Sequence, residues 1–403
     1  MKRLLALLCC PLLCSQAIAN TAELLGPDLE PKWVEIRTIA PELIRVDDGR
    51  GEALLLDPDE VLRLTLSRNE PETRDPGRSA VYLRDGQVLV GTLIASNDDE
   101  AVRLKLDANR AAQVPLDEML SLAIERDAQP PAVDEDDALL LATGEVLTGF
   151  VETVTKDGVG FVVGDADDAI EIPMSRIRAL SIANKPRPAQ AKTGTLRVET
   201  TDGAVLLLED ATLTPEASNK PARVLTGVSS LPIFASRRAD DGVSTEAAKR
   251  LSIDLSRVLS IEPVSTRFRL MPLSSVAMEV VSGGAVFGVQ MLPRIDSGGA
   301  IRLHAPTTLR FDLPDGATRL AMTVGLDLSD DLPGSRRKLA GCTLRVYLDD
   351  RAIAEHALTP DGPAKRLNLS VGPGALRVAI DPGINGPVLD RVRISDAGLL
   401  VSE

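Results

Sequence analysis

The segment Val114-Pro-Leu-Asp-Glu-Met-Leu-Ser-Leu122 decides the interpretation of the first two thirds of the sequence, because similar segments occur three more times. Each has an apolar residue, a short turn and a strand pattern; the other copies are Leu56-Asp-Pro-Asp-Glu-Val-Leu-Arg-Leu64, Ile172-Pro-Met-Ser-Arg-Ile-Arg-Ala-Leu180 and Ile253-Asp-Leu-Ser-Arg-Val-Leu-Ser-Ile261. Met119 lies 58 residues after Val61, and Ile177 lies 58 residues after Met119. Self-similarity at a fixed spacing predicts tandem copies of one structural unit.

The residues before each repeated segment predict a hairpin. Strand patterns flank Asp85-Gly86, Thr143-Gly144 and Asp202-Gly203, and glycine accepts the positive φ that tight hairpin turns require. A third strand and then the repeated segment follow, so one repeat contains four or five short strands. A unit of this size is expected to be a strongly bent sheet or a miniature barrel. Its pattern resembles the SH3-like or Sm-like barrels that occur in tandem in exported bacterial proteins.

Segments rich in proline and charge lie between the repeats. Such segments stay out of hydrophobic cores, so we take them as the linkers that separate the repeats. The boundaries that follow are a degenerate first repeat over 20–68, repeat 2 over 80–125, repeat 3 over 137–183 and repeat 4 over 194–263. The last copy is longer than the others, and its segment 209–247, rich in Ser, Pro, Asp and Arg, is expected to be an inserted exposed loop.

The first nineteen residues are typical of a secretory signal peptide. Lys2 and Arg3 precede the apolar run Leu4 to Leu13, and Ala17-Ile-Ala19 has the small residues of a cleavage site. Ten apolar residues are too few to cross about 30 Å of hydrocarbon, and no later stretch approaches a membrane span. We therefore expect residues 1–19 to direct export to the periplasm or the cell exterior.

Composition excludes several classes of function. The chain has 403 residues with a net charge of -14, so it offers no basic surface for nucleic acid. It contains two histidines and four cysteines, and three of the cysteines lie in the predicted signal, which excludes a disulfide framework and a Cys/His zinc cluster. Aromatic residues make up 2%, so the cores must be built from aliphatic side chains.

The last third of the chain has longer strands with clean alternation of apolar and polar residues. This period of two, which buries one face of a strand and exposes the other to solvent, occurs in Thr308–Leu313, Thr343–Leu348 and Ala375–Ile380. In this alternation Phe311 falls on the buried face, and Cys342 begins a strand as a buried apolar residue. The whole chain is therefore predicted to be all-β, with a two-sheet sandwich or jelly roll from 266 to 403.

Five segments of this region, in order, resemble the novel putative carbohydrate-binding module (NPCBM) that accompanies family 98 glycoside hydrolases. They are Leu270-Met-Pro-Leu-Ser-Ser-Val276, Ile301-Arg-Leu-His-Ala-Pro-Thr-Thr-Leu-Arg-Phe-Asp-Leu-Pro314, Thr318-Arg-Leu-Ala-Met-Thr-Val-Gly-Leu-Asp327, Leu344-Arg-Val-Tyr-Leu-Asp-Asp350 and Leu389-Asp-Arg-Val-Arg-Ile-Ser-Asp-Ala397. The resemblance implies a galactose-binding-like β-sandwich. The family usually has a tryptophan where this sequence has Ile394.

Four residues are candidates for carbohydrate contact: His304, Asp327, Tyr347 and Asp390. His304 could donate to a sugar hydroxyl or hold a neighbouring loop through its ring nitrogens. Asp327, followed by Asp330 and Asp331, could be a solvated loop or could bind a structural Ca²⁺, although the spacing fits no EF-hand. Asp390 could cap a turn instead of binding a ligand. Tyr347 could stack against a sugar ring.

The sequence contains no nucleophile motif beside a histidine, and small barrels with a sandwich leave no domain large enough for a deep catalytic cleft. We therefore expect a non-enzymatic, exported protein without a cofactor. Its C-terminal sandwich binds a cell-wall or extracellular glycan, and its barrels act as spacer and interaction modules. The alternative is a structural or protein-binding scaffold of the cell envelope, with an envelope protein as partner, whose sandwich has lost sugar affinity.

Overall fold

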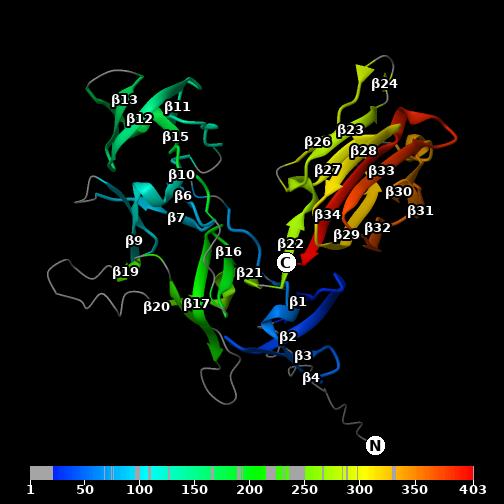
Figure 1. Cartoon of the computed structure of the whole chain (residues 1–403), viewed down its shortest axis with the longest axis horizontal. Helices are drawn as coiled ribbons and strands as arrows, with labels where there is room; N and C mark the ends of the chain where they lie inside the picture. The colour runs from blue at the N-terminus through cyan, green and yellow to red at the C-terminus, as the bar shows by residue number, and fades with distance from the viewer. Residues whose placement is uncertain are drawn as a thin grey trace, which may run out of the picture. The chain divides into compact units, whose positions relative to one another are not determined.

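The computed structural model describes residues 21–402 except 68, 74, 76, 96–99, 108–109, 126–127, 165–167, 188–191, 193, 215–223, 230, 232, 236–249, 266, 284, 287–288, 297 and 329–332. The predicted signal peptide over 1–19 lies outside these residues. The chain forms two compact units. Unit 1 runs to Leu24 and continues over Lys32–Val264, and unit 2 combines Leu25–Pro31 with Ser265–Glu403. Nearly all regular structure is β-strand, as the sequence predicted (Figure 1).

Unit 1 contains four five-stranded modules with one topology. Modules 1 and 2 consist of β1 (Thr21–Leu25), β2 (Pro31–Ala40), β3 (Leu43–Asp48), β4 (Ala53–Leu56) and β5 (Arg63–Leu66), and of β6 (Ser79–Leu83), β7 (Val88–Leu93), β8 (Ala101–Lys105), β9 (Arg110–Pro115) and β10 (Met119–Ala123). In each module the strands pair antiparallel in a meander, and the fifth strand returns to the first. Successive side chains of a strand point to opposite faces, so the apolar residues of these strands lie on one face and pack into a shared core.

Modules 3 and 4 repeat the same pairing. Module 3 consists of β11 (Asp137–Leu141), β12 (Val146–Val154), β13 (Gly158–Val163), β14 (Ile170–Pro173) and β15 (Ile177–Ser181). Module 4 consists of β16 (Leu196–Thr200), β17 (Val205–Thr214), β18 (Val224–Ser229), β20 (Arg250–Asp254) and β21 (Val258–Pro263), with the extra strand β19 (Ile233–Ala235).

The repeated sequence segments coincide with a one-turn 3-10 helix between the fourth and fifth strand of each module. These turns are η1 (Pro58–Glu60), η2 (Leu116–Glu118), η3 (Met174–Arg176) and η4 (Leu255–Arg257). Asp57 and Asp254 cap two of them by accepting the N–H of the residue two positions later. Pro173 and Pro115 precede the other two. The turn reverses the chain so that the fifth strand can pair with the first.

The modules associate in pairs through their fifth strands. β10 pairs with β15 and joins modules 2 and 3, whereas β5 pairs with β21 and joins modules 1 and 4. An asparagine after the fifth strand secures each pair. Asn184 Nδ2 donates to the carbonyls of Leu116 and Met119 in module 2, at 2.9 and 2.8 Å. Asn69 Nδ2 likewise donates to the carbonyls of Leu255 and Val258 in module 4.

Two features differ from the sequence expectation. The segment 209–247 was expected to be an inserted loop, but its described part includes the end of β17, all of β18 and β19. β18 pairs with β17 and β20 and so completes the module 4 meander. In addition, Leu25–Pro31, which falls within the expected first repeat, belongs to unit 2. Leu29 is 1% exposed there, and Asn368 Nδ2 donates to Asp28 O at 2.6 Å.

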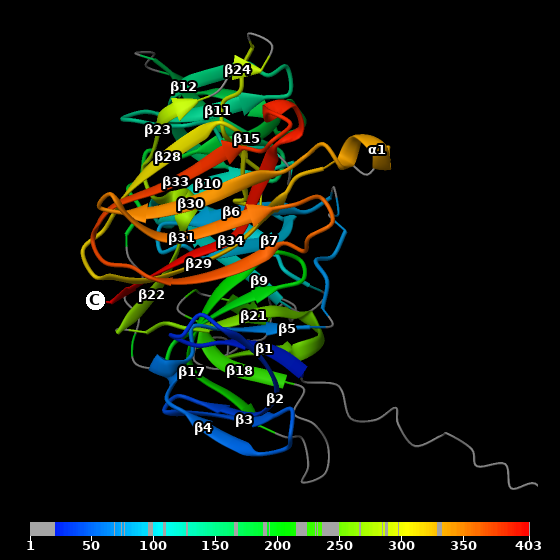
Figure 2. The same cartoon turned by 90° about the vertical axis from the view of Figure 1, so that its right-hand side faces the viewer.

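Unit 2 contains a six-stranded and a five-stranded sheet. The first consists of β26 (Arg294–Ile295), β27 (Ile301–His304), β34 (Arg391–Ser402), β29 (Ala317–Leu326) and β32 (Lys365–Ser370), with β22 (Phe268–Pro272) paired to β34. The second has the order β23 (Met278–Gly283), β28 (Thr307–Leu313), β33 (Gly374–Pro382), β30 (Cys342–Leu348) and β31 (Arg351–Leu358), visible in Figure 2. Apart from these sheets, unit 2 has the short hairpin β24 (Ala285–Val286) to β25 (Val289–Gln290), α1 (Gly334–Arg337), η5 (Leu273–Ser275) and η6 (Pro387–Leu389).

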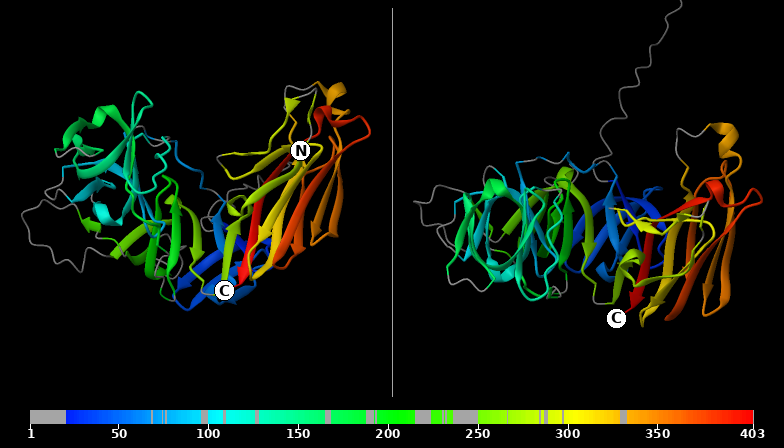
Figure 3. Two further views of the ribbon diagram at one scale, coloured as in Figure 1. Left: turned by 45° about the horizontal axis from the view of Figure 1, so that its top comes forward. Right: turned by 90° about the horizontal axis from the view of Figure 1, so that it is seen from above.

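One aliphatic core joins the inward residues of the two sheets, whose strands run alongside one another in both views of Figure 3. Phe311 and Val378 are fully buried in it, and Cys342 is 4% exposed, as the alternation of the strands predicted. Sheets that bury one face and leave the other wet account for the clean period of two in this region. Across the described parts of both units, no helix is long or apolar enough to cross a membrane.

Candidate functional site

Three of the segments that resemble NPCBM meet at one end of the sandwich, around Asp390. The Asp390 side chain is fully buried, and its carboxylate accepts the N–H of Gly341 at 2.8 Å and of Gly383 at 2.9 Å. Its backbone carbonyl accepts the N–H of Ala305, and the carbonyl of the next residue accepts the N–H of Asp327. Asp390 therefore ties together the loops at Ala305, Gly341 and Gly383, and its neighbour Arg391 adds the loop at Asp327.

His304 ends β27 beside this junction and is 5% exposed. Its Nδ1 lies 2.8 Å from Ala305 O, a carbonyl that only accepts, so Nδ1 carries the proton. The carbonyl of His304 accepts from the Thr307 hydroxyl. The ring thus supports the start of β28, and its burial leaves little of it for a ligand.

Asp327 lies on the exposed side of the same end, within a cluster of two carboxylates and two guanidinium groups that we call the arginine cluster: Asp296, Arg302, Asp327 and Arg393. Arg302 is 3.4 Å from Asp296 Oδ2 and 3.6 Å from Asp327 Oδ2, and Arg393 is 3.5 Å from Asp296 Oδ2. The side chains of Arg302 and Arg393 are 48% and 47% exposed. Hydrogen bonds from Ala300 N–H and Gly298 N–H, together with the two arginines, hold the pKa of Asp296 below its ordinary value despite partial desolvation.

Sequence reasoning selected Asp327 but missed the other three members of the arginine cluster. A usable signal was present, because Arg302 and Arg393 occupy the polar positions of alternating strands whose apolar neighbours are buried. The pairing of β27 with β34 then places Arg302 directly opposite Arg393. Asp296 could not be found from the pattern, since its position depends on the loop that closes on Ala300.

Tyr347 is not part of this end. It lies on β30 in the other sheet, on the outward face, where Arg377 Cζ is 5.0 Å from the centre of its ring. Arg377 also pairs with Asp350 at 2.7 Å. The guanidinium covers one face of the tyrosine ring by a cation–π contact, so only the other face remains for a sugar. The structure therefore brings His304, Asp327 and Asp390 together and places Tyr347 apart from them.

The predicted Ca²⁺ site at Asp327 has no set of ligands among the residues that the structure describes. Among the residues that the structure describes, no three His, Cys, Asp or Glu side chains gather as metal ligands do. Asp330 and Asp331, which completed the predicted carboxylate cluster, lie outside those residues. Asp327 itself faces Arg302, and a cation beside a guanidinium is electrostatically unfavourable.

Cys342 is expected to resist alkylation in the folded protein. Burial, with a smaller contribution from the Asp390 carboxylate, raises the pKa of its thiol to about 12, so almost no thiolate forms near neutral pH. Treatment with iodoacetamide at pH 8, followed by peptide mass mapping, should leave Cys342 unmodified in buffer and label it fully in denaturant. Rapid labelling in buffer would contradict the burial of this thiol.

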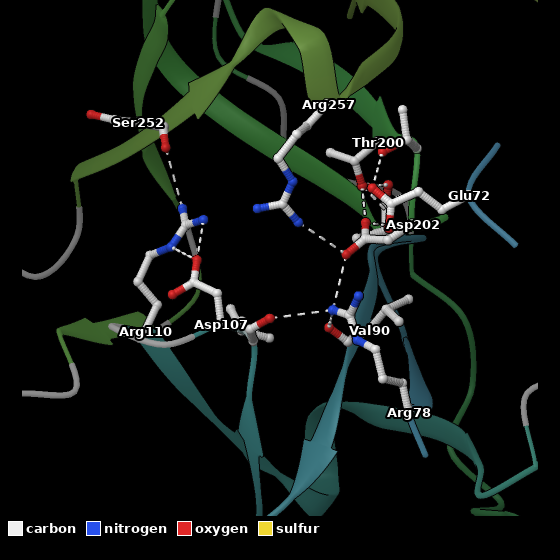
Figure 4. Close-up of polar contacts among 12 residues, drawn as sticks. Glu72, Arg78, Val90, Asp107, Arg110, Thr200, Asp202, Ser252 and Arg257 are labelled. Carbon is white, nitrogen blue, oxygen red and sulfur yellow. Dashed lines mark hydrogen bonds and ion pairs between the residues drawn. The ribbon is translucent and has the colours of Figure 1, made fainter. Parts of the chain in front are cut away.

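Unit 1 contains a buried ionic network between modules 2 and 4 (Figure 4). Its centre is Asp202, in the β16–β17 turn, with a side chain that is 5% exposed. Its carboxylate accepts from Thr200 Oγ1 at 2.5 Å and pairs with Arg78 at 2.9 Å and Arg257 at 3.3 Å. Burial raises the pKa of this carboxyl, but the hydroxyl and the two guanidinium groups outweigh burial and hold the pKa below its ordinary value. Arg78 precedes β6 of module 2, and Asp202 and Arg257 belong to module 4, so the network fastens the two modules.

A groove of about 1100 Å³ lies between modules 2 and 3. Phe150, which is 62% exposed, forms part of its wall. Most of its charged lining is acidic: Glu100, Asp117, Glu118, Glu135, Asp136, Asp137 and Glu152. Asp137 is structural, because its carboxylate accepts the N–H groups of Val151 and Ala183. Among the lining residues that the structure describes there is no histidine or cysteine that could serve as a nucleophile or a base.

No family model matches the sequence, and no curated protein matches it either. Similar solved structures include the CBM51-2 and INT domains of Clostridium perfringens ZmpB, at 17% identity and a TM-score of 0.26 over 44% of this chain and 37% of that one. They also include CBM51 of Clostridium perfringens GH95 in complex with methyl-galactose, at 18% identity and a TM-score of 0.24 over 32% of this chain and 99% of that one. Because these TM-scores are low, we assign no site residue from them.

Proposed function

We propose that the protein is an exported, non-catalytic carbohydrate-binding protein whose C-terminal sandwich contacts a cell-wall or extracellular glycan, with modules 1–4 as spacer and interaction elements. One observation carries the proposal. Three segments that resemble NPCBM meet at one end of the sandwich, where the buried Asp390 holds their loops and the arginine cluster stays exposed. A rigid scaffold beneath exposed polar groups is the arrangement that ligand recognition requires.

The arginine cluster suits sugar hydroxyls, which both donate and accept hydrogen bonds. Its carboxylates accept and its guanidinium groups donate in a planar fork. The ion pairs between them are long, at 3.4 to 3.6 Å, so the groups keep hydrogen-bonding capacity for a ligand. Recognition by polar groups also accommodates the scarcity of aromatic residues.

Glycan binding is expected to depend on Arg302. In the full chain, Arg302→Gln should weaken retention on the bound glycan about 10- to 100-fold, because it removes one charge-assisted hydrogen bond of about 1.5–3 kcal/mol. The measurement is a glycan array of galactose-containing, acidic and cell-wall glycans, followed by titration of the best ligand. The full chain is needed because Leu25–Pro31 packs on the sandwich.

Arg345→Gln is the matched control. Arg345 also pairs with two carboxylates, Glu355 and Asp381, but it lies on the five-stranded sheet. Its replacement should leave glycan retention unchanged. Tyr347→Ala tests the other candidate platform. Loss of binding with Tyr347→Ala but not with Arg302→Gln would move the site to β30, and absence of binding to every glycan would refute the proposed function.

The acidic groove in unit 1 favours a second candidate, the protein-binding scaffold. An exposed phenylalanine beside several carboxylates fits a basic protein segment better than a sugar, because aromatic side chains dominate protein interfaces. In that case the sandwich has no sugar affinity, and the same glycan array stays empty for the full chain and for all its variants.

A further inference from the structure

The four modules of unit 1 offer four equivalent sheet edges. In each module the fourth strand pairs with the third on one side and leads into the 3-10 turn, so its other side is an edge. These strands are β4, β9, β14 and β20. An edge strand presents unpaired N–H and C=O groups that can accept a further strand, and proteins usually protect such edges.

The edge of β9 already binds an added strand. β19, from module 4, pairs antiparallel with β9, with Ile233 opposite Ala112 and Ala235 opposite Arg110. Ala111 and Ala112 of β9 are 1% and 0% exposed. In the sequence the apolar strand β19 is followed closely by Arg237 and Arg238.

The edges of β14 and β20 are protected. β14 carries the exposed Glu171 within the strand, and a charge at that position opposes addition of a strand. On β20, the carbonyl of Ser252 accepts from Arg110 Nη1 at 3.3 Å. That side chain occupies an acceptor that an added strand would need.

The edge of β4 has neither of these protective features, a charged residue within the strand or a side chain bonded to its outward backbone. Its sequence Ala53-Leu-Leu-Leu56 contains no charge and no proline, and β3 is its one strand partner among the described residues. Leu55 is 65% exposed and Leu54 39%. Counted back from the 3-10 turn, Leu54 corresponds to Ala112, which is fully buried where β9 has its added strand.

The backbone of β4 is also available. Asp48 N–H donates to Glu52 O at the hairpin end, and alternate pairs of an antiparallel ladder exchange both bonds. Val46 with Leu54 and Ile44 with Leu56 are then the bonded pairs. Ala53 and Leu55 consequently direct their N–H and C=O groups away from β3, toward the open edge.

We propose that β4 is a docking edge for a short extended apolar strand of another protein, flanked by basic residues. Acidic residues border β4 on both sides: Glu52 precedes it, and Asp57, Asp59 and Glu60 follow it. Antiparallel pairing with a second copy, centred on Leu54 and Leu55, would place Glu52 opposite Asp57 and oppose like charges. A strand with basic ends pairs with opposite charge instead.

The test is an array of octapeptides with four apolar residues between Lys or Arg pairs, set against the same cores between Asp or Glu pairs. The full chain is expected to bind members of the first set and not of the second. For the best labelled peptide, measured by fluorescence anisotropy, Leu55→Pro should weaken binding at least 10-fold, because it removes an outward N–H and keeps the β3 bonds. Leu55→Lys should weaken it as well, by adding a positive charge beside the basic ends.

Ile170→Lys is the matched control, since Ile170 is 50% exposed on the protected edge of β14 and its replacement should leave peptide affinity unchanged. Unfolding of each variant, followed by the fluorescence of Trp33, should match the parent chain. No binding by any basic-ended peptide, or equal binding by Leu55→Pro, would overturn the proposal. So would concentration-dependent dimerisation that Leu55→Lys abolishes, which would assign the edge to a second copy. None of these outcomes bears on the glycan proposal.

Discussion

Replacing Asp202 by alanine is expected to lower the free energy of unfolding of unit 1 by about 3–5 kcal/mol, because removal of one partner leaves buried charge without compensation. Arg78 and Arg257 both lose their carboxylate, and the Arg78 side chain is only 16% exposed. Trp33, the one tryptophan of the chain, lies in module 1 and reports unfolding of unit 1 in a urea titration. Asp157→Ala, at a carboxylate with a side chain 73% exposed, is the control and should change the free energy by less than about 0.5 kcal/mol.

The same carboxylate makes unit 1 sensitive to acid. The pKa of Asp202 is lower in the folded state than the ordinary value of 3.8, so its stabilisation is complete well above pH 3.8 and is lost as the pH falls through the lower, folded-state pKa. In Asp202→Asn, part of the pH dependence of unfolding below about pH 4 should disappear. A variant with the stability and acid profile of the parent chain would show that the network contributes nothing to the joint between modules 2 and 4.

The second large effect is expected at Asp390. Asp390→Ala leaves the N–H groups of Gly341 and Gly383 without their acceptor, and each unsatisfied buried donor costs about 1–3 kcal/mol. Unit 2 should therefore lose about 2–5 kcal/mol of its free energy of unfolding, read as the denaturant concentration at which Cys342 becomes alkylated. Asp390→Asn keeps one acceptor and should lose less.

The control for Asp390 is Asp312→Ala, on the exposed face of β28, where the side chain is 72% exposed. It should leave the labelling midpoint of Cys342 unchanged. If Asp390→Ala also left that midpoint unchanged, the carboxylate would not hold the loops at Gly341 and Gly383. Glycan affinity should fall with Asp390→Ala through disorder of the arginine cluster, so it is measured at a denaturant-free condition where the variant remains folded.

Local pattern was sufficient for part of this structure. Alternation placed Phe311 and Cys342 in the core correctly, since period two depends on neighbours along one strand. The all-β class followed from the same signal. The arginine cluster could be predicted only in part. Its prediction requires the register of β27 against β34 as well as the apolar and polar pattern of each strand.

Contacts between distant residues could not be predicted from one sequence. Nothing near Leu29 indicates that it packs on unit 2, and nothing near Tyr347 indicates that Arg377 covers its ring. The burial of Asp390 is equally long-range, because its partners lie 49 and 7 residues away. For the segment 209–247, composition favoured a loop, but pairing of β18 with β17 and β20 overrode composition.

The association of module 1 with module 4 has a consequence for biosynthesis. Thr65 on β5 pairs with Ser260 on β21, which is synthesised 195 residues later. The strands that join modules 2 and 3, β10 and β15, are both synthesised before β21. At about 5–20 residues per second of translation, β5 stays without its neighbour for roughly 10–40 s. During that interval β5 is paired with β1 on one side only and its other edge stays open, so chaperones have a target in module 1.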